Sequence, residues 1–190
     1  MIGKFVDYLI INNITSEDMR EMHLYNFEVM IGKILNYGTL LLLSWINDNI
    51  LQTLAFMSVF FSLRSRNGGF HAKQFLHCYL GTIIIYFLTS NIMVPIMKTY
   101  KYVYLCVVIV SVIIVFLFAP VNHPNLQLND EEVRICKKSA RRLIVGISIG
   151  AIILIKLNMI SECVYYMIAG MGINTGLLLL AKILKQEVRE

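Results

Sequence analysis

The feature that most constrains this chain is a pair of long uncharged apolar segments joined by a short basic link. Residues 79–97 and 102–119 contain no Asp, Glu, Lys or Arg, and the link between them reads KTYK. An uncharged apolar stretch of about 18 or more residues is a candidate transmembrane helix, since about 20 residues span the ~30 Å hydrocarbon core of a bilayer. The chain as a whole is 57% hydrophobic, 15% charged and has a mean hydropathy of +0.68. These values are typical of an integral membrane protein and predict an all-α fold in a lipid bilayer.

Four further apolar stretches bring the expected number of crossings to about six. Residues 38–46, extended back to about Gly32, and residues 50–63 flank a polar Asn-Asp-Asn turn and predict a hairpin. Its arms are short for a full crossing, so the second fits a thin membrane or a position covered by protein. Residues 143–155 and 163–181 form the last pair. We therefore treat residues 1–190 as one polytopic membrane domain.

The N-terminal part differs from these spans because charged residues interrupt it. Between residues 15 and 34 apolar side chains recur at helical spacing, and Thr15 with Asp18 matches a capping-box start. This pattern predicts an amphipathic helix at the membrane interface, within an amphipathic region at 1–31, and packing on protein is the alternative. No cleavable signal peptide is apparent, because the first apolar stretch, FVDYLII, is short and contains an aspartate.

Six crossings place both termini on one side of the membrane. All of the 17 Lys and Arg residues except Lys98, Lys101 and Lys156 then fall on that same side, which also holds segments 64–78 and 120–142. By the positive-inside rule this side is the cytoplasm. We expect a multi-pass protein of the cell membrane with cytoplasmic termini. The net charge of +5 does not predict a nucleic-acid partner, because no soluble basic domain accompanies it.

Residues 64–78, RSRNGGFHAKQFLHC, interrupt the apolar sequence and contain residues that could carry chemistry. A cytosolic cysteine near a histidine and basic residues has the composition of a thiol nucleophile with its base, which makes Cys78 and His71 the candidates. The structural alternative is a small buried cysteine and an interfacial histidine. His77 competes for the base role. Neighbouring helical residues point about 100° apart, whereas a spacing of seven returns to nearly the same face, so His71 is favoured.

Distance sets a condition on this pair. Seven residues of continuous helix rise about 10.5 Å, which is too far for an imidazole to reach a thiol. The pair therefore requires a break in the helix, a re-entrant turn or a second subunit. Gly68 and Gly69 favour a break, which would place His71 at or before the start of the helix that carries Cys78. The alternative for the two glycines is an ordinary loop turn.

The basic residues have two interpretations each. Arg64, Arg66 and Lys73 could bind an acidic peptide or stabilise an oxyanion, or they could anchor a span at anionic headgroups. The predicted cytosolic loop at 120–142 ends in a basic cluster that could attract an acidic partner or serve as a similar anchor.

Four cysteines without CxxC spacing predict neither a zinc site nor a disulfide framework, and we expect no metal or cofactor. Glycines in the last two spans predict a packing face or a homodimer face.

The pattern R-x3-G-G-x-H-x6-C, formed by Arg64, Gly68, Gly69, His71 and Cys78, resembles the AgrB family of membrane peptidases in Gram-positive quorum sensing. The resemblance implies a cysteine endopeptidase that removes the acidic C-terminal tail of an AgrD-like precursor and promotes cyclisation to a thiolactone or lactone. It also implies Cys78 as nucleophile, His71 as base, and Arg64 and Gly69 as residues needed for processing. Two alternatives remain, a non-catalytic peptide transporter or export scaffold and a purely structural membrane protein.

Overall fold

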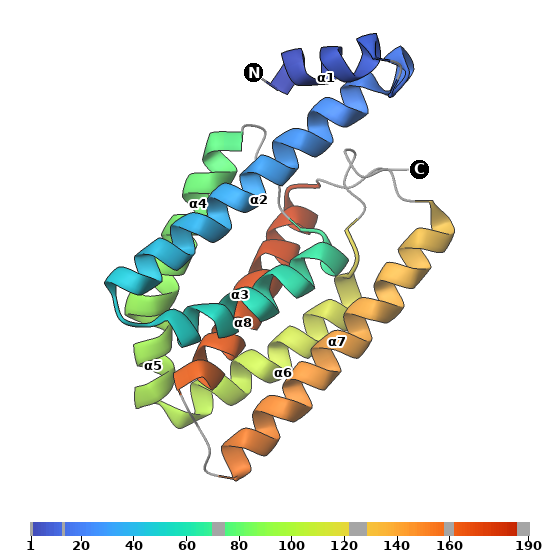
Figure 1. Ribbon diagram of the computed structural model, residues 1–190. Helices are drawn as coiled ribbons and strands as arrows, with labels where there is room; N and C mark the ends of the chain where they lie inside the picture. The colour runs from blue at the N-terminus through green and yellow to red at the C-terminus, as the bar shows by residue number, and fades with distance from the viewer. Residues whose placement is uncertain (1, 13, 70–74, 122–128, 158–161, 186–190) are drawn as a thin grey trace.

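The protein is a helical bundle in which a central pair of helices, α3 and α8, lies between two outer groups (Figure 1). The computed structural model describes residues 2–12, 14–69, 75–121, 129–157 and 162–185, and all regular structure in these ranges is helical. The all-α expectation is confirmed for them. In chain order the helices are α1 (Ile2–Ile11), the 3-10 turn η1 (Glu17–Met19), α2 (Arg20–Ile46), α3 (Ile50–Asn67), α4 (Phe75–Leu88), the π-helical segment η2 (Thr89–Met93), α5 (Val94–Thr99), α6 (Lys101–Phe118), α7 (Asp130–Lys156) and α8 (Glu162–Ile183).

The contact between α3 and α8 is the most extensive in the bundle. Gly170 of α8 lies against the backbone of α3, where a Cβ would be 3.0 Å from the carbonyl oxygen of Phe56. The absence of a side chain at this position lets the two helices approach closely. Leu63, Ile168 and Leu178 are fully buried around this contact. Close packing at α3 determines where this helix ends, and the glycine pair of the candidate site follows that end directly.

The N-terminal region corrects one prediction. Residues 20–46 form one uninterrupted helix, so 15–34 is not a separate interfacial helix, and the amphipathic helix of this region is α1. The apolar sequence continues through Gly38 without a proline or a capping signal, and nothing in it ends the helix near residue 34.

The predicted capping box at Thr15 is also wrong. The Thr15 hydroxyl oxygen lies 2.7 Å from Nε2 of His23, and the side chain of Ser16, the N-cap of η1, makes no capping hydrogen bond. A bond from Arg20 Nη2 to Asp7 Oδ1 at 2.9 Å joins α2 to α1. These polar contacts turn α1 back over the start of α2, as Figure 1 shows at the end marked N.

The segment α4–η2–α5 is a continuous helix with a π-helical insertion. Pro95 lies in the first turn of α5 and has no N–H to donate. Its ring would clash with the carbonyl of Asn91 in a regular α-helix, and the wider π-turn gives it room. The hydroxyl of Ser90 lies 2.7 Å from that of Tyr166, which connects the insertion to α8. The predicted span at 79–97 is confirmed as helical.

The basic stretch at 130–142 is helical, which corrects the prediction of a loop across 120–142. It forms the first half of α7, and residues 122–128 lie outside the described part of the chain. The side chain of Asn129 accepts from the backbone of Glu132, and the Glu132 carboxylate accepts from the Asn129 N–H. This reciprocal capping box starts the helix. The basic cluster therefore lies on a rigid element that continues into the apolar half of α7.

Three helical stretches are long and apolar enough to cross a membrane within the described residues. They are 17–46, 76–99 and 162–183, and a shorter apolar helix covers 102–118. At 1.5 Å per residue, α3 and the 102–118 stretch reach about 27 Å or less, which is short of the ~30 Å core. The structure thus supports an integral membrane protein, and the count of about six crossings stays a prediction.

Polar contacts gather at two opposite ends of the bundle. We call the first the arginine end, defined by Arg64, Arg66 and Arg141. We call the second the lysine–glutamate end, defined by Lys98 and Glu162. Helix α3 connects them, because Gln52 in its first turn donates to Oε2 of Glu162 at 3.3 Å and its last turns carry Arg64 and Arg66. The candidate residues gather at the arginine end.

Candidate functional site

The helix breaks at the glycine pair, as the sequence predicts. Helix α3 ends at Asn67, and Gly68 and Gly69 have φ angles of +66° and +122°. Residues with a side chain rarely adopt such angles. A Cβ at Gly68 would also lie 2.5 Å from the carbonyl oxygen of Val121. Backbone conformation and space both require glycine here, and the helix break that the sequence predicts is present.

The second glycine leaves room for a guanidinium group. Arg64 lies one turn before the end of α3, and a Cβ at Gly69 would overlap with its Nη1. The same nitrogen lies 3.4 Å from the carbonyl oxygen of Gly68, to which it donates. The predicted supporting residues Arg64, Gly68 and Gly69 therefore form one contact. Without a side chain at residue 69, the turn packs directly on the arginine.

Cys78 lies at the beginning of the next helix. It is the fourth residue of α4, a half-buried free thiol, and its carbonyl accepts a bond from Thr82 Oγ1 at 3.0 Å. The next residue, Tyr79, has its hydroxyl 2.7 Å from Thr39 Oγ1, which fastens α4 to α2. The sequence predicts a position near a helix start for this cysteine, and its role as nucleophile stays a prediction.

Arg64 and Cys78 are electrostatically coupled. Burial lowers the pKa of the Arg64 guanidinium, and the negative charge of a Cys78 thiolate raises it. The fold therefore packs the arginine on the glycine turn and couples its charge to Cys78, which lies 14 positions further along the chain.

The remaining predicted residues have different outcomes. His71 and Lys73 lie in 70–74, outside the described residues, so the His71–Cys78 pairing stays a prediction. His77 is exposed on α4. Arg66 donates from Nη1 to the Ser62 carbonyl at 2.7 Å and from Nε to Ser139 Oγ at 2.8 Å. The bond to Ser139 connects α3 to α7, so Arg66 has a structural role in the described contacts.

Two asparagines of the site were not predicted. Asn67, the last residue of α3, and Asn174 of α8 are fully buried and hydrogen-bonded to each other at 2.7 Å. The backbone oxygen of Asn67 accepts from the N–H of Val121 at 2.9 Å. The sequence contained a signal for Asn174, because its polar amide side chain interrupts an otherwise apolar span. Such residues in membrane helices usually face protein.

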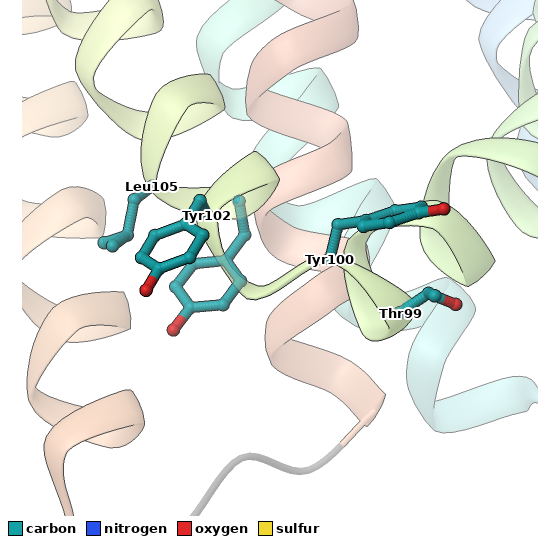
Figure 2. Close-up of a pocket in the computed structure, with 5 residues that line it drawn as sticks. Thr99, Tyr100, Tyr102 and Leu105 are labelled. Carbon is teal, nitrogen blue, oxygen red and sulfur yellow. The ribbon is translucent and has the colours of Figure 1, made fainter.

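Within the described ranges, no group of three His, Cys, Asp or Glu side chains could hold a metal ion. A pocket lies at the turn between α5 and α6, lined by Thr99, Tyr100, Tyr102, Tyr104 and Leu105. Figure 2 shows the Tyr100 ring pointing away from the Tyr102 ring. The pocket follows Lys98 in the chain, at the lysine–glutamate end, and its lining residues include no cysteine.

Comparison with known proteins gives a family. The family model described as "AgrB: Accessory gene regulator B" matches residues 2–179, which is almost the whole chain. No curated protein and no solved structure matches the chain.

Proposed function

The chain belongs to the AgrB family, and from this premise we propose that it is a membrane cysteine endopeptidase acting on an AgrD-like precursor peptide. Membership implies a part in processing the autoinducer of the accessory gene regulator system, and AgrB proteins are generally processing peptidases. The observation that carries the finer proposal is Cys78, in the first turn of α4 and coupled to Arg64. A cysteine that only filled space in the bundle would need neither a helix start nor a nearby arginine.

The proposed reaction has two acyl transfers. The Cys78 thiol gives its proton to His71, and the thiolate attacks the carbonyl carbon of the precursor residue that directly precedes the acidic tail. The C–N bond breaks, and the tail leaves as an amine that takes the proton from the His71 imidazolium. The resulting thioester is then attacked by an internal thiol or hydroxyl of the precursor. This step closes the thiolactone or lactone, and the released Cys78 sulfur regains a proton.

Charge at the arginine end supports this substrate. Arg64 is electrostatically coupled to the cysteine, and Arg134, Lys137, Lys138 and Arg142 lie on the first half of α7. A positive surface attracts an acidic tail and positions it near the nucleophile. The site also lies at the end of apolar helices, where limited water favours ring closure over hydrolysis of the thioester.

The proposed topology is six crossings with both termini and the arginine end in the cytoplasm. The bond between Arg66 and Ser139 supports it, because residues 64–78 and 130–142 then share one end of the bundle. Accessibility labelling of single cysteines placed at residues 66, 138 and 190 should report the cytoplasm, and at 49, 101 and 158 the outside. Opposite labelling at 66 and 138 would contradict the six-span topology.

The test of the activity is co-expression with an AgrD-like precursor carrying an acidic tail. His71→Ala and Cys78→Ser should each reduce tail removal by at least about 100-fold while membrane insertion is retained. His77→Ala should retain substantial cleavage. Mass spectrometry should detect an acyl group on Cys78 that hydroxylamine removes. Cleavage that survives Cys78→Ser would instead support the transporter or export-scaffold alternative.

A homodimer is the proposed assembly. Gly146 and Gly150 of α7 face open space, which suits close contact with a second copy in a bilayer. Co-expressing a His71→Ala chain with a Cys78→Ser chain tests whether subunits share a site. We expect no recovery of cleavage in verified heterodimers, because the turn at Gly68 and Gly69 allows a pairing within one chain. Recovery would show that the site is shared.

A further inference from the structure

Asn67 and Asn174 form a buried polar contact between α3 and α8. Asn67 Nδ2 donates to Asn174 Oδ1 at 2.7 Å, and Asn174 Nδ2 lies 3.5 Å from the carbonyl oxygen of Phe60. Both side chains are fully buried. Burying amides costs free energy that a pair of apolar side chains would not, and Gly170 already provides the close packing of these helices. The pair therefore needs an explanation besides packing.

Asn67 is the point where three parts of the chain meet. Its side chain donates to Asn174 of α8, and its backbone oxygen accepts from the N–H of Val121, in the segment after α6. Gly68 follows it directly in the chain. Gly68 in turn lies against the Val121 carbonyl. A residue fixed on both sides in this way determines the direction in which the backbone leaves α3. That direction sets the position of the glycine turn.

The same face of α8 continues to the glycine turn. Gly170, Asn174 and Leu177 follow one another at spacings of four and three, which places them on one side of the helix. Gly170 lies against Phe56, and a Cβ at Gly69 would be 3.5 Å from the carbonyl oxygen of Leu177. Helix α8 thus contacts the middle of α3, its last residue and the turn beyond it.

The turn in turn determines where Arg64 lies. Its Nη1 packs against Gly69 and donates to the Gly68 carbonyl, so a shift of the turn would displace the guanidinium. That guanidinium is the charge coupled to Cys78. The chain of contacts therefore runs from Asn174 to Asn67, to the glycine turn, to Arg64 and to the cysteine, with direct contact at each step up to the arginine.

We propose that Asn67 and Asn174 are positioning residues for the acyl transfer, whose hydrogen bond holds the Gly68–Gly69 turn where Arg64 can act on Cys78. This inference rests on the proposed peptidase function. The two asparagines touch neither the thiol nor the substrate in this role. They act through the turn, and their effect should be visible in the reactivity of Cys78 as well as in cleavage.

The experiment distinguishes two roles for the asparagines. They could position the glycine turn, or they could only provide hydrogen-bond partners for each other. Removing one amide leaves the other without its partner, which destabilises a protein for trivial reasons. Replacing both by Leu removes every unpaired group and suits a membrane bundle. The variants are therefore Asn174→Leu, the double variant Asn67→Leu/Asn174→Leu, and Asn174→Asp, which keeps an oxygen that can accept from Asn67. All are made in the full chain.

A neighbouring pair provides the matched control. The hydroxyls of Ser111 on α6 and Thr175 on α8 are buried and lie 3.1 Å apart, one residue along α8 from Asn174. They connect α8 to α6 and lie away from the glycine turn. The double variant Ser111→Ala/Thr175→Val removes a buried interhelical hydrogen bond without reaching Arg64.

Two measurements are made on each purified variant: cleavage of the precursor, and the rate at which iodoacetamide alkylates Cys78 across pH. Alkylation uses chains in which the other cysteines, Cys106, Cys136 and Cys163, are alanine. We expect the double Leu variant to stay folded, with cleavage reduced about tenfold or more. Cys78 alkylation at neutral pH should fall about threefold or more, because less thiolate is present. The control should change by less than about twofold in both.

Several outcomes would overturn the proposal. A double Leu variant with unchanged cleavage and alkylation would show that the amides serve only each other. Should that variant not fold, Asn174→Asp decides: folded protein with normal alkylation supports positioning, and folded protein with alkylation as low as in Asn174→Leu contradicts it. Failure of the peptidase proposal is recognised separately, because Cys78→Ser would then still cleave, while the alkylation measurement needs no turnover.

Discussion

At the lysine–glutamate end, Lys98 of α5 contacts the carboxylate of Glu162 on α8, and Gln52 of α3 donates to the same group. At the arginine end, Arg66 donates to a Ser hydroxyl and a backbone carbonyl, and Arg141 donates to the carbonyl of Phe116 at 2.7 Å. Opposite charges pair at the first end, whereas Arg66 and Arg141 at the second donate to neutral oxygens within the described part of the chain. One end is suited to fastening helices and the other also to attracting an anionic ligand.

The cysteines of the two ends sharpen this contrast. Cys78 and Cys163 are both half-buried free thiols in the first turn of a helix, α4 and α8 respectively. Helix position and burial are therefore nearly the same. Their charged neighbours differ, because Cys78 is coupled to Arg64 whereas Cys163 follows Glu162 directly in the chain. The coupling to an arginine is the difference between the two cysteines, and on our proposal it marks Cys78 as the nucleophile.

The largest expected effect comes from exchanging the sulfur at each end. Cys78→Ser should abolish tail removal, with a loss of at least about 100-fold, because a hydroxyl is far less nucleophilic than a thiolate. Cys163→Ser should keep more than half of the activity. Both are measured as precursor cleavage per folded enzyme. Equal losses would show that the two ends do not differ in chemistry.

The glycine turn should give the next largest effect. Gly68→Ala places a side chain at φ +66° and toward the Val121 carbonyl, so we expect a loss of about 1–2 kcal/mol in the free energy of unfolding from conformation alone. Cleavage should fall about tenfold or more as the turn moves. The control is Gly81→Ala on α4, which faces open space and should be stabilising by up to about 1 kcal/mol. Thermal unfolding in detergent measures both, and a tolerated Gly68→Ala would remove the geometric basis of the site.

A smaller loss is expected from the arginine that connects α3 to α7. Arg66→Met removes its bonds to Ser62 and Ser139, and we expect a cost of about 1–2 kcal/mol in the free energy of unfolding. The exposed Lys138 on the same part of α7 is the control, and Lys138→Met should cost less than about 0.5 kcal/mol. If denaturation curves show equal effects, the arginine end owes its structure to packing and not to this bond.

The smallest effect should come from the ion pair at the opposite end. Lys98 and Glu162 are both partly exposed, so Lys98→Met should lower stability by only about 0.2–1 kcal/mol. Cleavage should stay within about twofold of the unmodified protein. A double-mutant cycle with Glu162→Gln isolates the coupling energy. A large loss of cleavage in any of these variants would show that the two ends communicate and would break the comparison.

Local signals in the sequence predicted much of this arrangement. The apolar runs indicated helices, the polar Asn-Asp-Asn turn separated α2 from α3, and the adjacent glycines marked the helix break, since each depends on neighbouring residues alone. The capping box at Asn129 and Glu132 was an equally local signal, and noticing it would have extended α7 over the basic cluster. The N-terminal error had another cause, because charged residues at 15–34 do not stop a helix that continues into an apolar span.

What the sequence by itself determined is therefore the class of protein, the helix break at Gly68 and Gly69, and the cysteine and histidine as candidates, because these follow from hydropathy, backbone freedom and residue chemistry. Only the tertiary structure decided that the Arg64 guanidinium packs on the Gly68–Gly69 turn. It also decided that Asn67 pairs with Asn174, 107 positions away in the chain. Such contacts depend on how α3, α4 and α8 pack, and packing is a property of the whole bundle that no single segment encodes.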